Sequence, residues 1–501
     1  MKSLFRLVSQ PLNSNSTADQ IHWPQLHLIA LVGLILRLLI AFTSDQINHP
    51  DEIFQYLEQA HRLVFGYGYI PWDYRFGIRS WILPGLLSVP LQVVKVLHLD
   101  EPEIYISIIK ILTCLVSVSL IYCVYEVGRR LASEEVGRWA SVIACFWHEL
   151  IVFAHKPTPE CLSTYLLMGA LVCLLGRSTW LSAGLLGVMG AGILALRLQY
   201  APVVLVLAIA TLLLWKRDRA LVAAGSFLAV LLLVGYVDYL TWGRFFGSYY
   251  NNYLYNQVYG VSSIFGKVFP LYYLGTLILF SGGIFPVVIF SVAREKMRSQ
   301  WLLLSLLVSI VIPHSLIPHK EYRFIYATVP ICILLTTIAF VELKHRCHQP
   351  NSKRPRLPLY LATFMIFWSI LGTLSSTAFF SKKDTLESYL FLSDQPNLVA
   401  IANLHSAWYE SGGYYYLHRN VPIYSIEDFA PVSPADYSKY VSHIVCPEDR
   451  EALPGFTKMA KFGSLEVRRN ENPPPDYESL GVDTYRPLQG GVDGVLEPPK
   501  F

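Results

Sequence analysis

Charged side chains are scarce in this chain. Only 15% of its 501 residues are Asp, Glu, Lys or Arg, whereas 53% are hydrophobic and the mean hydropathy is +0.41. Soluble domains carry about 25% charged residues. Many apolar stretches reach roughly 18 residues, the length needed to cross a bilayer. This composition excludes an ordinary soluble protein and predicts an all-α polytopic membrane protein.

The sequence also lacks cysteine motifs, a cleavable signal and internal repeats. The eight cysteines form no CxxC pair and no Cys/His spacing typical of a metal site, so we predict neither a disulfide framework nor a bound metal. Residues 1–25 are polar, and the apolar stretch that follows reads as a signal anchor and not as a cleavable signal. We find no internal repeat, which counts against many transporter architectures.

Hydropathy predicts about eleven spans. They lie at roughly 26–43, 103–125, 137–155, 161–176, 180–196, 200–215, 220–240, 271–293, 301–315, 325–343 and 358–379. An apolar segment at 82–99 is ambiguous, and the distribution of Lys and Arg decides its placement. If 82–99 lies in the interface, five connections containing Lys or Arg fall on the same side as Lys2 and Arg6. These connections carry Arg129, Arg130 and Arg138; Arg177; Lys216, Arg217 and Arg219; Arg294, Lys296 and Arg298; and Lys344, Arg346, Lys353, Arg354 and Arg356.

This topology predicts the organisation of the chain. A cytoplasmic N-terminus is expected at 1–25, a transmembrane domain at 26–380 and an external tail at 381–501. Within the membrane domain, residues 45–80 form the first external loop. The tail is predicted to be a small α/β domain, with strand-like runs at 421–424 and 442–446 and a partly disordered end after about residue 472.

The first external loop contains "HPDEIFQYLEQAHR" (49–62). Pro50 suits the first position of a helix, and Asp51 and Glu52 then occupy its first turn, where the helix dipole favours negative charge. Apolar residues recur at helical spacing from Ile53 to Val64, so we predict an amphipathic helix on the outer membrane surface. The two acids either serve only to start the helix or form part of a site.

A second polar cluster lies in "PHSLIPHKEYRFIY" (313–326), where His314, His319, Lys320, Glu321 and Arg323 stand at the edge of a span. Basic residues at such an edge can be simple interfacial anchors. Anchors of that kind concentrate on the cytoplasmic side, however, and this cluster is predicted on the opposite side. Charge in that position indicates a functional site.

A carboxylate and a cationic cluster that face one cavity suit one reaction class. The carboxylate removes a proton from an acceptor hydroxyl, and the cations hold a phosphate leaving group. Glycosyl transfer from a lipid phosphate suits a site at the bilayer edge, because the lipid tail of the donor must stay in the membrane.

The motifs resemble those of glycosyltransferase family 22, the dolichyl-phosphate-mannose-dependent mannosyltransferases that extend GPI anchors and N-glycan precursors. The resemblance is carried by "HPDEIFQYLEQAHRLVFGYGYIPWDYRFGIRSW" (49–81) and "HSLIPHKEYRFIY" (314–326). Weaker similarities lie in "HKPTPECLSTYLL" (155–167), "ALRLQYAPVVL" (195–205) and "NQVYGVSSIFG" (256–266). The family resemblance implies the GT-C membrane fold and an inverting transfer that forms an α-mannoside.

The resemblance implies a polyprenyl-phosphate-linked sugar donor and a lipid-linked glycan or glycolipid acceptor, with no cofactor, no metal and no nucleic acid. Asp51 is the candidate general base, and Glu52 shares that role, orients the acceptor or only stabilises the helix. The candidates for donor phosphate binding are His319, Lys320, Arg323, Arg197 and Arg79. The candidates for acceptor or sugar binding are His49, Gln55, Ser262, Ser263, Glu160 and Glu321.

Each role has a structural alternative. Arg79 could pack the first loop, Glu160 could be a charge at the end of a span, and Glu321 could pair with a neighbouring cation. Ser262 and Ser263 could belong to a plain turn. Arg37, inside the first span, is too costly in lipid to stand idle and is expected to be paired within the bundle.

A polytopic lipid or sugar transporter, or flippase, is the alternative function. The external loops and the tail contain no Asn-x-Ser/Thr sequon. We therefore expect a multi-pass protein of a bacterial inner membrane with its site facing the periplasm, and an ER membrane with a lumenal site is the alternative.

Asp51→Asn is expected to abolish sugar transfer, because the amide cannot accept the proton of the acceptor hydroxyl. Transfer is measured in membranes that contain equal amounts of wild type and variant. Normal membrane insertion together with normal activity would contradict the assignment.

Overall fold

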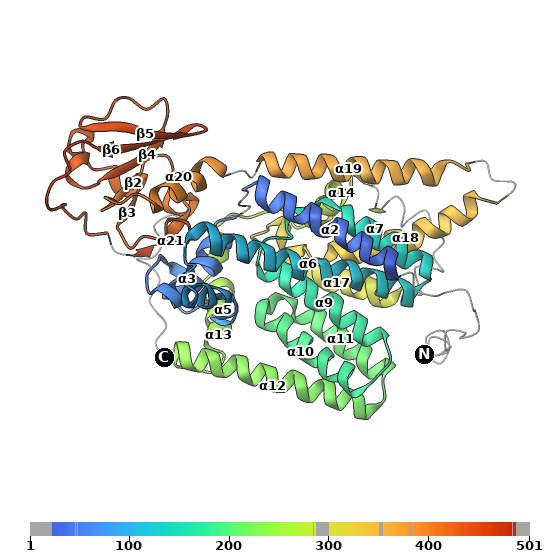
Figure 1. The fold of residues 1–501 in the computed structure, drawn as a ribbon. Coiled ribbons are helices and arrows are strands. Elements are labelled where there is room, and N and C mark those ends of the chain that lie inside the picture. Colours follow the sequence, from blue (N-terminus) through green and yellow to red (C-terminus); the bar gives the residue numbers. More distant parts are fainter. Residues whose placement is uncertain are drawn as a thin grey trace. The chain divides into compact units, whose positions relative to one another are not determined.

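The computed structural model describes residues 23–45, 47, 49–283, 285–286, 300–349, 354–379, 382–482 and 484–486 (Figure 1). The predicted N-terminal segment up to residue 22 lies outside this part of the chain, as do Lys2, Arg6, Arg294, Lys296, Arg298, Lys353 and the last 15 residues, 487–501. Two compact units emerge. Unit 1 comprises Met1–Ile40, Leu112–Leu240 and Arg244–Ser376, and unit 2 comprises Ala41–Ile111, Thr241–Gly243 and Thr377–Phe501.

Five helices among the described residues are long and apolar enough to cross a membrane. They are α2 (Trp23–Thr43), α6 (Pro102–Leu131), α12 (Arg217–Trp242), α18 (Thr328–Cys347) and α19 (Leu357–Phe379). Shorter apolar helices are α5 (Ile82–Val96), α9 (Pro159–Leu175), α10 (Trp180–Leu196), α11 (Ala201–Leu214) and α17 (Trp301–Leu316). The count of eleven spans stays a prediction.

Some predicted spans are divided or shortened. The stretch predicted as one span at 137–155 consists of α7 (Glu134–Phe146) and α8 (His148–Val152), because Trp147 between them is extended. The ambiguous segment forms α5, whose 15 residues extend over about 22 Å at 1.5 Å each, less than the ~30 Å hydrocarbon core. Its interfacial placement stays a prediction.

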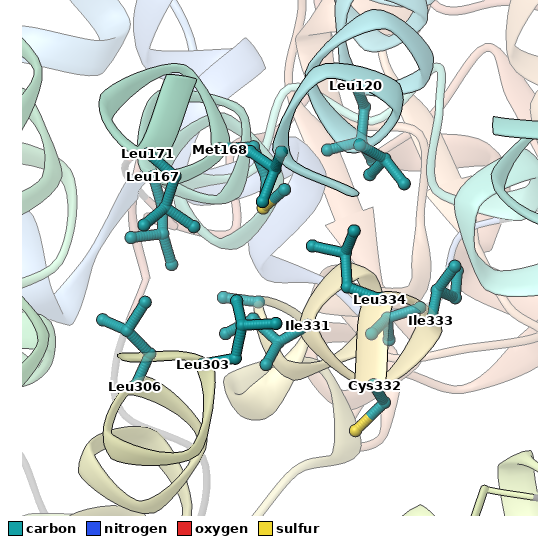
Figure 2. Packing of buried hydrophobic residues seen from close by; sticks show 14 of the residues in the cluster. Leu120, Leu167, Met168, Leu171, Leu303, Leu306, Ile331, Cys332, Ile333 and Leu334 are labelled. Atoms are coloured by element: carbon teal, nitrogen blue, oxygen red, sulfur yellow. The ribbon is translucent and has the colours of Figure 1, made fainter. Parts of the chain in front are cut away.

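The core of unit 1 is built around α18. From Thr328 to Val341 every residue of this helix is buried, which is the pattern of a helix surrounded by others. Figure 2 shows Ile331, Ile333 and Leu334 of α18 among apolar side chains of neighbouring helices. These neighbours include Leu120 of α6, Leu167, Met168 and Leu171 of α9, and Leu303 and Leu306 of α17.

The predicted Arg37 pairing is confirmed in unit 1. The guanidinium is fully buried and donates to backbone carbonyl oxygens: Nη1 to Gly33 at 2.9 Å, and Nη2 to Ala144 at 3.3 Å. Three further short elements of this unit lie between α12 and α14 (Tyr272–Phe280). They are α13 (Gly247–Tyr253), the π-helix η3 (Leu254–Val258) and the 3-10 helix η4 (Val261–Ser263).

The tail contains a five-stranded sheet in the order β3-β2-β4-β6-β5 (Figure 1). β2 pairs in parallel with β3 and β4, whereas β6 runs antiparallel to β4 and β5. The strands are β2 (Ile401–Asn403), β3 (Ile423–Ser425), β4 (His443–Pro447), β5 (Phe456–Phe462) and β6 (Leu465–Asn470). The strands predicted at 421–424 and 442–446 are thus confirmed as β3 and β4, and the external placement of the tail stays a prediction.

Unit 2 joins this sheet to the first loop. The loop forms the π-helix η1 (Glu52–Leu57), which continues as α3 (Glu58–Phe65), then the short strand β1 (Ile70–Pro71) and α4 (Trp72–Arg75). β1 pairs in parallel with β7 (Tyr485–Arg486). The tail adds the helical elements α20 (Lys383–Ser393), η6 (Trp408–Glu410), α21 (Gly413–Leu417), α22 (Ile426–Phe429) and η7 (Pro434–Lys439).

The helix predicted after Pro50 is present, but its polar face is not exposed. Glu52 and Gln55 are buried, and Glu58 has no exposed surface. Glu58 Oε1 accepts hydrogen bonds from the backbone N–H groups of Tyr69 (2.8 Å) and Tyr414 (3.2 Å), and Oε2 accepts from Tyr415 N–H (2.8 Å). The tail thus covers the polar face of the predicted amphipathic helix, and the placement of this helix on the outer membrane surface stays a prediction.

The pKa of Glu58 is raised in the folded protein. Burial raises its pKa from an ordinary 4.5 to about 7, although the three N–H bonds oppose the rise. The neighbouring His61 stays neutral above pH 5, because burial lowers its pKa to about 3. Between pH 4.5 and 7 the folded state therefore retains a proton on Glu58 that the unfolded chain releases.

Glu58→Gln is expected to remove the contribution of Glu58 to the pH dependence of the free energy of unfolding. Because the pKa of Glu58 is raised in the folded state, its contribution to the free energy of unfolding falls as pH rises from 4.5 to 7. Over that pH range the free energy of unfolding of wild type should fall by about 3 kcal/mol relative to that of Glu58→Gln. Thermal unfolding in detergent at pH 5 and pH 8 measures this difference. Glu103→Gln, which changes an exposed carboxylate, is the control and should keep the wild-type pH dependence.

Candidate active site

Asp51 and Glu52 of unit 2 differ in accessibility. Asp51 caps η1, and its side chain retains 20% of its surface, whereas Glu52 is 6% exposed. Asp51 Oδ2 lies 3.3 Å from His49 Nδ1, and the backbone N–H of Asp51 lies 3.3 Å from the same nitrogen. A single ring nitrogen either donates or accepts, so the protonation state of His49 decides which contact is a hydrogen bond. Asp51 is thus the more accessible carboxylate of the two.

Arg79, a predicted phosphate ligand, is paired with a residue that sequence reasoning missed. Its Nε donates to Oδ2 of Asp73 at 3.0 Å, and Asp73 is 1% exposed. Burial raises the pKa of Asp73, the charge of Arg79 opposes the rise and the charge of Asp51 adds to it. Asp51, Asp73 and Arg79 are therefore electrostatic neighbours. The signal that could have found Asp73 is its place six residues before Arg79 in the motif at 49–81.

Gln55 lies on the same helix as Asp51. Its backbone carbonyl accepts from the hydroxyl of Tyr74 at 2.8 Å, and its side chain is buried. Its side-chain oxygen has no hydrogen-bond partner among the residues that the structure describes. Gln55 is thus a buried amide with an unused acceptor, next to the loop that carries Asp73 and Arg79.

In unit 1, Glu160 and Arg197 form a buried ion pair. Pro159 begins α9 and places Glu160 in its first turn, while Arg197 follows the last residue of α10 in an extended conformation. Arg197 Nη1 donates to Glu160 Oε1, and the two residues are 8% and 2% exposed. Within the described part of the chain, Arg197 Nε and Glu160 Oε2 have no hydrogen-bond partner. The pair is therefore incompletely satisfied.

The predicted motif at 314–326 forms a second set of paired charges. Glu321 Oε1 lies 2.9 Å from His319 Nε2, and Glu321 Oε2 accepts from Arg323 Nε at 2.6 Å. Arg323, in the 3-10 helix η5 (Tyr322–Ile325), is 3% exposed. The structure thus gives Glu321 the pairing role that was one of its two sequence-based interpretations.

Lys320 does not extend into solvent. It is 6% exposed, and its ammonium group donates to the carbonyl oxygens of Val268 (3.1 Å), Ile317 and Pro318 (3.5 Å). The alternative interpretation of a snorkelling anchor is therefore wrong for Lys320. Its charge is held inside the protein by backbone dipoles.

The two sets of charges meet at Phe324. The Arg197 guanidinium lies 4.9 Å from the centre of the Phe324 ring, and the Arg323 guanidinium lies 5.5 Å from it. The hydroxyl of Tyr200 donates to the carbonyl oxygen of Phe324 at 3.1 Å. We call Glu160, Arg197, His319, Lys320, Glu321 and Arg323 the Arg197–Arg323 cluster. Three cations against two carboxylates leave it one positive charge with its histidine neutral.

Aromatic side chains and His314, to which the sequence assigned no specific role, surround this cluster. The His314 ring packs against Tyr200 (5.6 Å between ring centres) and Tyr273 (6.3 Å). Its Nδ1 lies 2.8 Å from the Ile310 carbonyl oxygen, and its Nε2 has no partner among the described residues. His314 stood in the quoted motif, whereas Tyr273 carried no signal beyond its place near the start of an apolar stretch.

Ser262 and Ser263 lie in a loop that packs on the motif. The Ser262 hydroxyl donates to the backbone carbonyl of Asn256 at 3.1 Å. Phe265, a few residues on, lies 6.0 Å from the His319 ring, and the backbone N–H of Val268 donates to the Pro318 carbonyl at 3.0 Å. The structure therefore places this loop beside the cluster through Phe265 and Val268.

The residues that the structure describes contain no group of three or more His, Cys, Asp or Glu side chains that could hold a metal ion. Acid–base and electrostatic chemistry is what the carboxylates and cations described above can supply.

Solved structures show which fold this is. ArnT from Cupriavidus metallidurans, bound to undecaprenyl phosphate, matches with a TM-score of 0.60 at 11% identity, covering 90% of this chain and 98% of that one. The Archaeoglobus fulgidus oligosaccharyltransferase matches with a TM-score of 0.51 at 12% identity, covering 86% and 70%. These enzymes have the GT-C fold, so the expected fold is confirmed and the chain is an integral membrane protein of that class.

The sequence comparisons narrow the class. The chain belongs to the Alg9-like mannosyltransferase family, whose profile matches residues 28–418. GPI mannosyltransferase 3 of Yarrowia lipolytica is 27% identical over 432 residues, covering 81% of this chain and 78% of the relative. Mannosyltransferase APTG1 of Arabidopsis thaliana is 23% identical over 502 residues, covering 90% and 83%. The resemblance seen in the motifs is thus confirmed, and the chain is a glycosyltransferase.

Removing only Glu160 is expected to destabilise unit 1 more than removing the whole pair. Glu160→Leu leaves Arg197 buried without its counter-ion, which should cost about 3–5 kcal/mol. Glu160→Leu combined with Arg197→Met should recover most of that loss, because no buried charge remains. Thermal unfolding of the two variants in detergent measures the difference. A double variant as unstable as Glu160→Leu would contradict this account.

Proposed function

We propose that the protein transfers mannose from a polyprenyl-phosphate-mannose donor to a hydroxyl of a lipid-linked glycan or glycolipid. The relatives support mannose as the sugar, because two of them are called mannosyltransferases. The ArnT structure supports a lipid phosphate at the site, since it contains undecaprenyl phosphate. The family result favours an enzyme over the transporter that the sequence left as an alternative.

The observation that carries the proposal is the buried positive charge of the Arg197–Arg323 cluster. A donor phosphodiester carries one negative charge, and the phosphate acquires a second as its bond to the sugar breaks. Cations that already lie in a buried site stabilise this developing charge without having to reorganise. Arg197 also has a buried Nε for which the described residues supply no acceptor, and a phosphate oxygen would supply one.

The members of the cluster would then act in different ways. Arg197 and Arg323 are suited to direct contact with the phosphate, because a guanidinium presents donors in a planar fork. Lys320 already donates to backbone carbonyls, so its contribution would be the field of its charge. Glu160 and Glu321 would orient the two arginines through their ion pairs.

In the proposed reaction, the acceptor oxygen attacks C1 of the mannose while the bond from C1 to the phosphate oxygen breaks. The proton of the acceptor hydroxyl moves to the carboxylate of Asp51. Attack from the face opposite the phosphate converts a β-linked donor into an α-mannoside. Asp51 is preferred to Glu52 as the base because more of its side chain is accessible.

The acceptor and the membrane are part of the proposal. Gln55, His49 and the loop with Ser262 and Ser263 are the candidate acceptor or sugar contacts. We keep the bacterial inner membrane with a periplasm-facing site as the proposed location, on the absence of external sequons. The ER membrane, with a lumenal site, is the competing location.

The donor is tested in purified membranes with synthetic short-chain polyprenyl-phosphate-mannose and, separately, GDP-mannose. Wild type should add a hexose to a lipid acceptor only with the lipid-linked donor, as seen by mass spectrometry. Arg323→Gln should lower kcat by about 100-fold or more, because it removes a cation from the leaving group.

Arg346→Gln is the matched control. Arg346 is about half exposed and pairs with Glu342 within α18, so its replacement should leave the rate unchanged. Transfer from GDP-mannose alone, or full activity of Arg323→Gln, would overturn the proposal.

A further inference from the structure

The tail contacts the helix that carries Asp51 at one buried point. We propose that the segment from Gly413 to Tyr415 positions Asp51 for catalysis by binding the carboxylate of Glu58. This inference rests on the proposed function, because it takes Asp51 as the general base. It gives the tail sheet and its helices, which have no role in the chemistry itself, a part in the reaction.

The contact uses hydrogen bonds that the tail cannot satisfy within itself. The N–H groups of Tyr414 and Tyr415 lie in the first turn of α21, where a helix has no acceptors of its own. The carboxylate of Glu58 accepts from both, at 3.2 Å and 2.8 Å. A carboxylate from a segment more than 350 residues away in the sequence thus caps the start of α21.

The backbone of the tail approaches Glu58 closely at Gly413, where an added side chain would force its neighbours to shift. Gly413 has φ +60°, and a Cβ there would lie 2.8 Å from Glu58 Oε2 and 3.0 Å from the Phe54 ring. The first distance is shorter than real Cβ atoms show, and the second is tighter than nine in ten real Cβ contacts. A side chain at this position would therefore push α21 and the first-loop helix apart.

Further contacts surround this point. The hydroxyl of Tyr105 donates to the Tyr415 carbonyl, and His61 Nε2 lies 3.0 Å from His418 Nδ1. The Phe54 ring packs edge-on against Trp408 at 5.1 Å. The contact is thus buried, and it joins the first-loop helix to the tail at several atoms.

The position of Glu58 links this contact to Asp51. Asp51 caps η1, η1 continues directly into α3, and Glu58 is the first residue of α3. Asp51 therefore lies seven residues before Glu58 on one continuous helical segment. The hydrogen bonds that hold Glu58 therefore fix the orientation of the helical segment that begins at Asp51. A displacement of about 1 Å at a reacting group can cost 100-fold in rate.

Gly413→Ala tests the proposal, with Gly455→Ala as its matched control. Both glycines lie in the tail with positive φ, +60° and +76°, so an alanine strains the backbone similarly at each. Only at Gly413 does the added Cβ meet Glu58, since its nearest neighbour at Gly455 is Ser438 Cβ at 4.0 Å. Glu58→Gln is the second variant, because it keeps the size of the side chain and removes its charge.

The readouts are kcat and KM for transfer from synthetic polyprenyl-phosphate-mannose, with hydrogen exchange of the amides in 51–65 and 413–418. We expect Gly413→Ala and Glu58→Gln to lower kcat at least tenfold, to change the donor KM less than twofold and to speed exchange at Tyr414 and Tyr415. Gly455→Ala should match wild type in both readouts.

The outcomes separate this inference from the function on which it rests. Wild type that transfers nothing from the lipid-linked donor refutes the proposed function. Active wild type with a folded and equally active Gly413→Ala refutes the positioning role alone. Equal losses in both glycine variants also refute it, because backbone strain in the tail would then explain them.

Discussion

Burying an unpaired charge costs several kcal/mol, and this constraint governs a chain in which only 15% of residues are charged. The structure meets it by pairing charges with each other or with backbone dipoles. Arg37 and Lys320 donate to carbonyl oxygens, Glu58 accepts from N–H groups, and Glu160 pairs with Arg197. Each pairing ties together segments that are far apart in sequence or at opposite ends of a turn. The apolar core around α18 buries hydrophobic side chains. The polar contacts in addition determine which segments of the chain lie together.

The same constraint explains where chemistry becomes possible. In the Arg197–Arg323 cluster the pairing is incomplete: one positive charge is left over, and Arg197 Nε has no acceptor among the described residues. This excess positive charge lowers the stability of the protein when no ligand is bound, and a bound anion compensates for it. A site of this kind suits an enzyme whose leaving group gains negative charge in the transition state. In the proposed reaction, stability and function oppose each other at these residues.

In unit 2, the same constraint on buried charge joins two segments of the chain. Glu58 is buried at the cost of a raised pKa, and its hydrogen bonds join the first loop to the tail. The tail carries none of the residues that act in the proposed reaction. Its parallel strands and short helices instead present the start of α21 to the loop that carries Asp51.

The sequence by itself determined the class of protein, because hydropathy and scarcity of charge are linear properties of the chain. It also determined the family and the main candidate residues, since Asp51 and the motif around Arg323 lie in contiguous stretches. The strands at 421–424 and 442–446 and the helix after Pro50 could be predicted for the same reason. Their local patterns are strong.

Only the tertiary structure decided which of these residues meet. Glu160 and Arg197 are separated by a whole helix hairpin, and Asp73 has no distinctive pattern until Arg79 folds against it. Tyr273 looked like a member of an apolar stretch, and Glu58 lay on the polar face of a predicted amphipathic helix. Burial and pairing depend on which other segment covers a side chain, and that segment is set by packing across the whole chain.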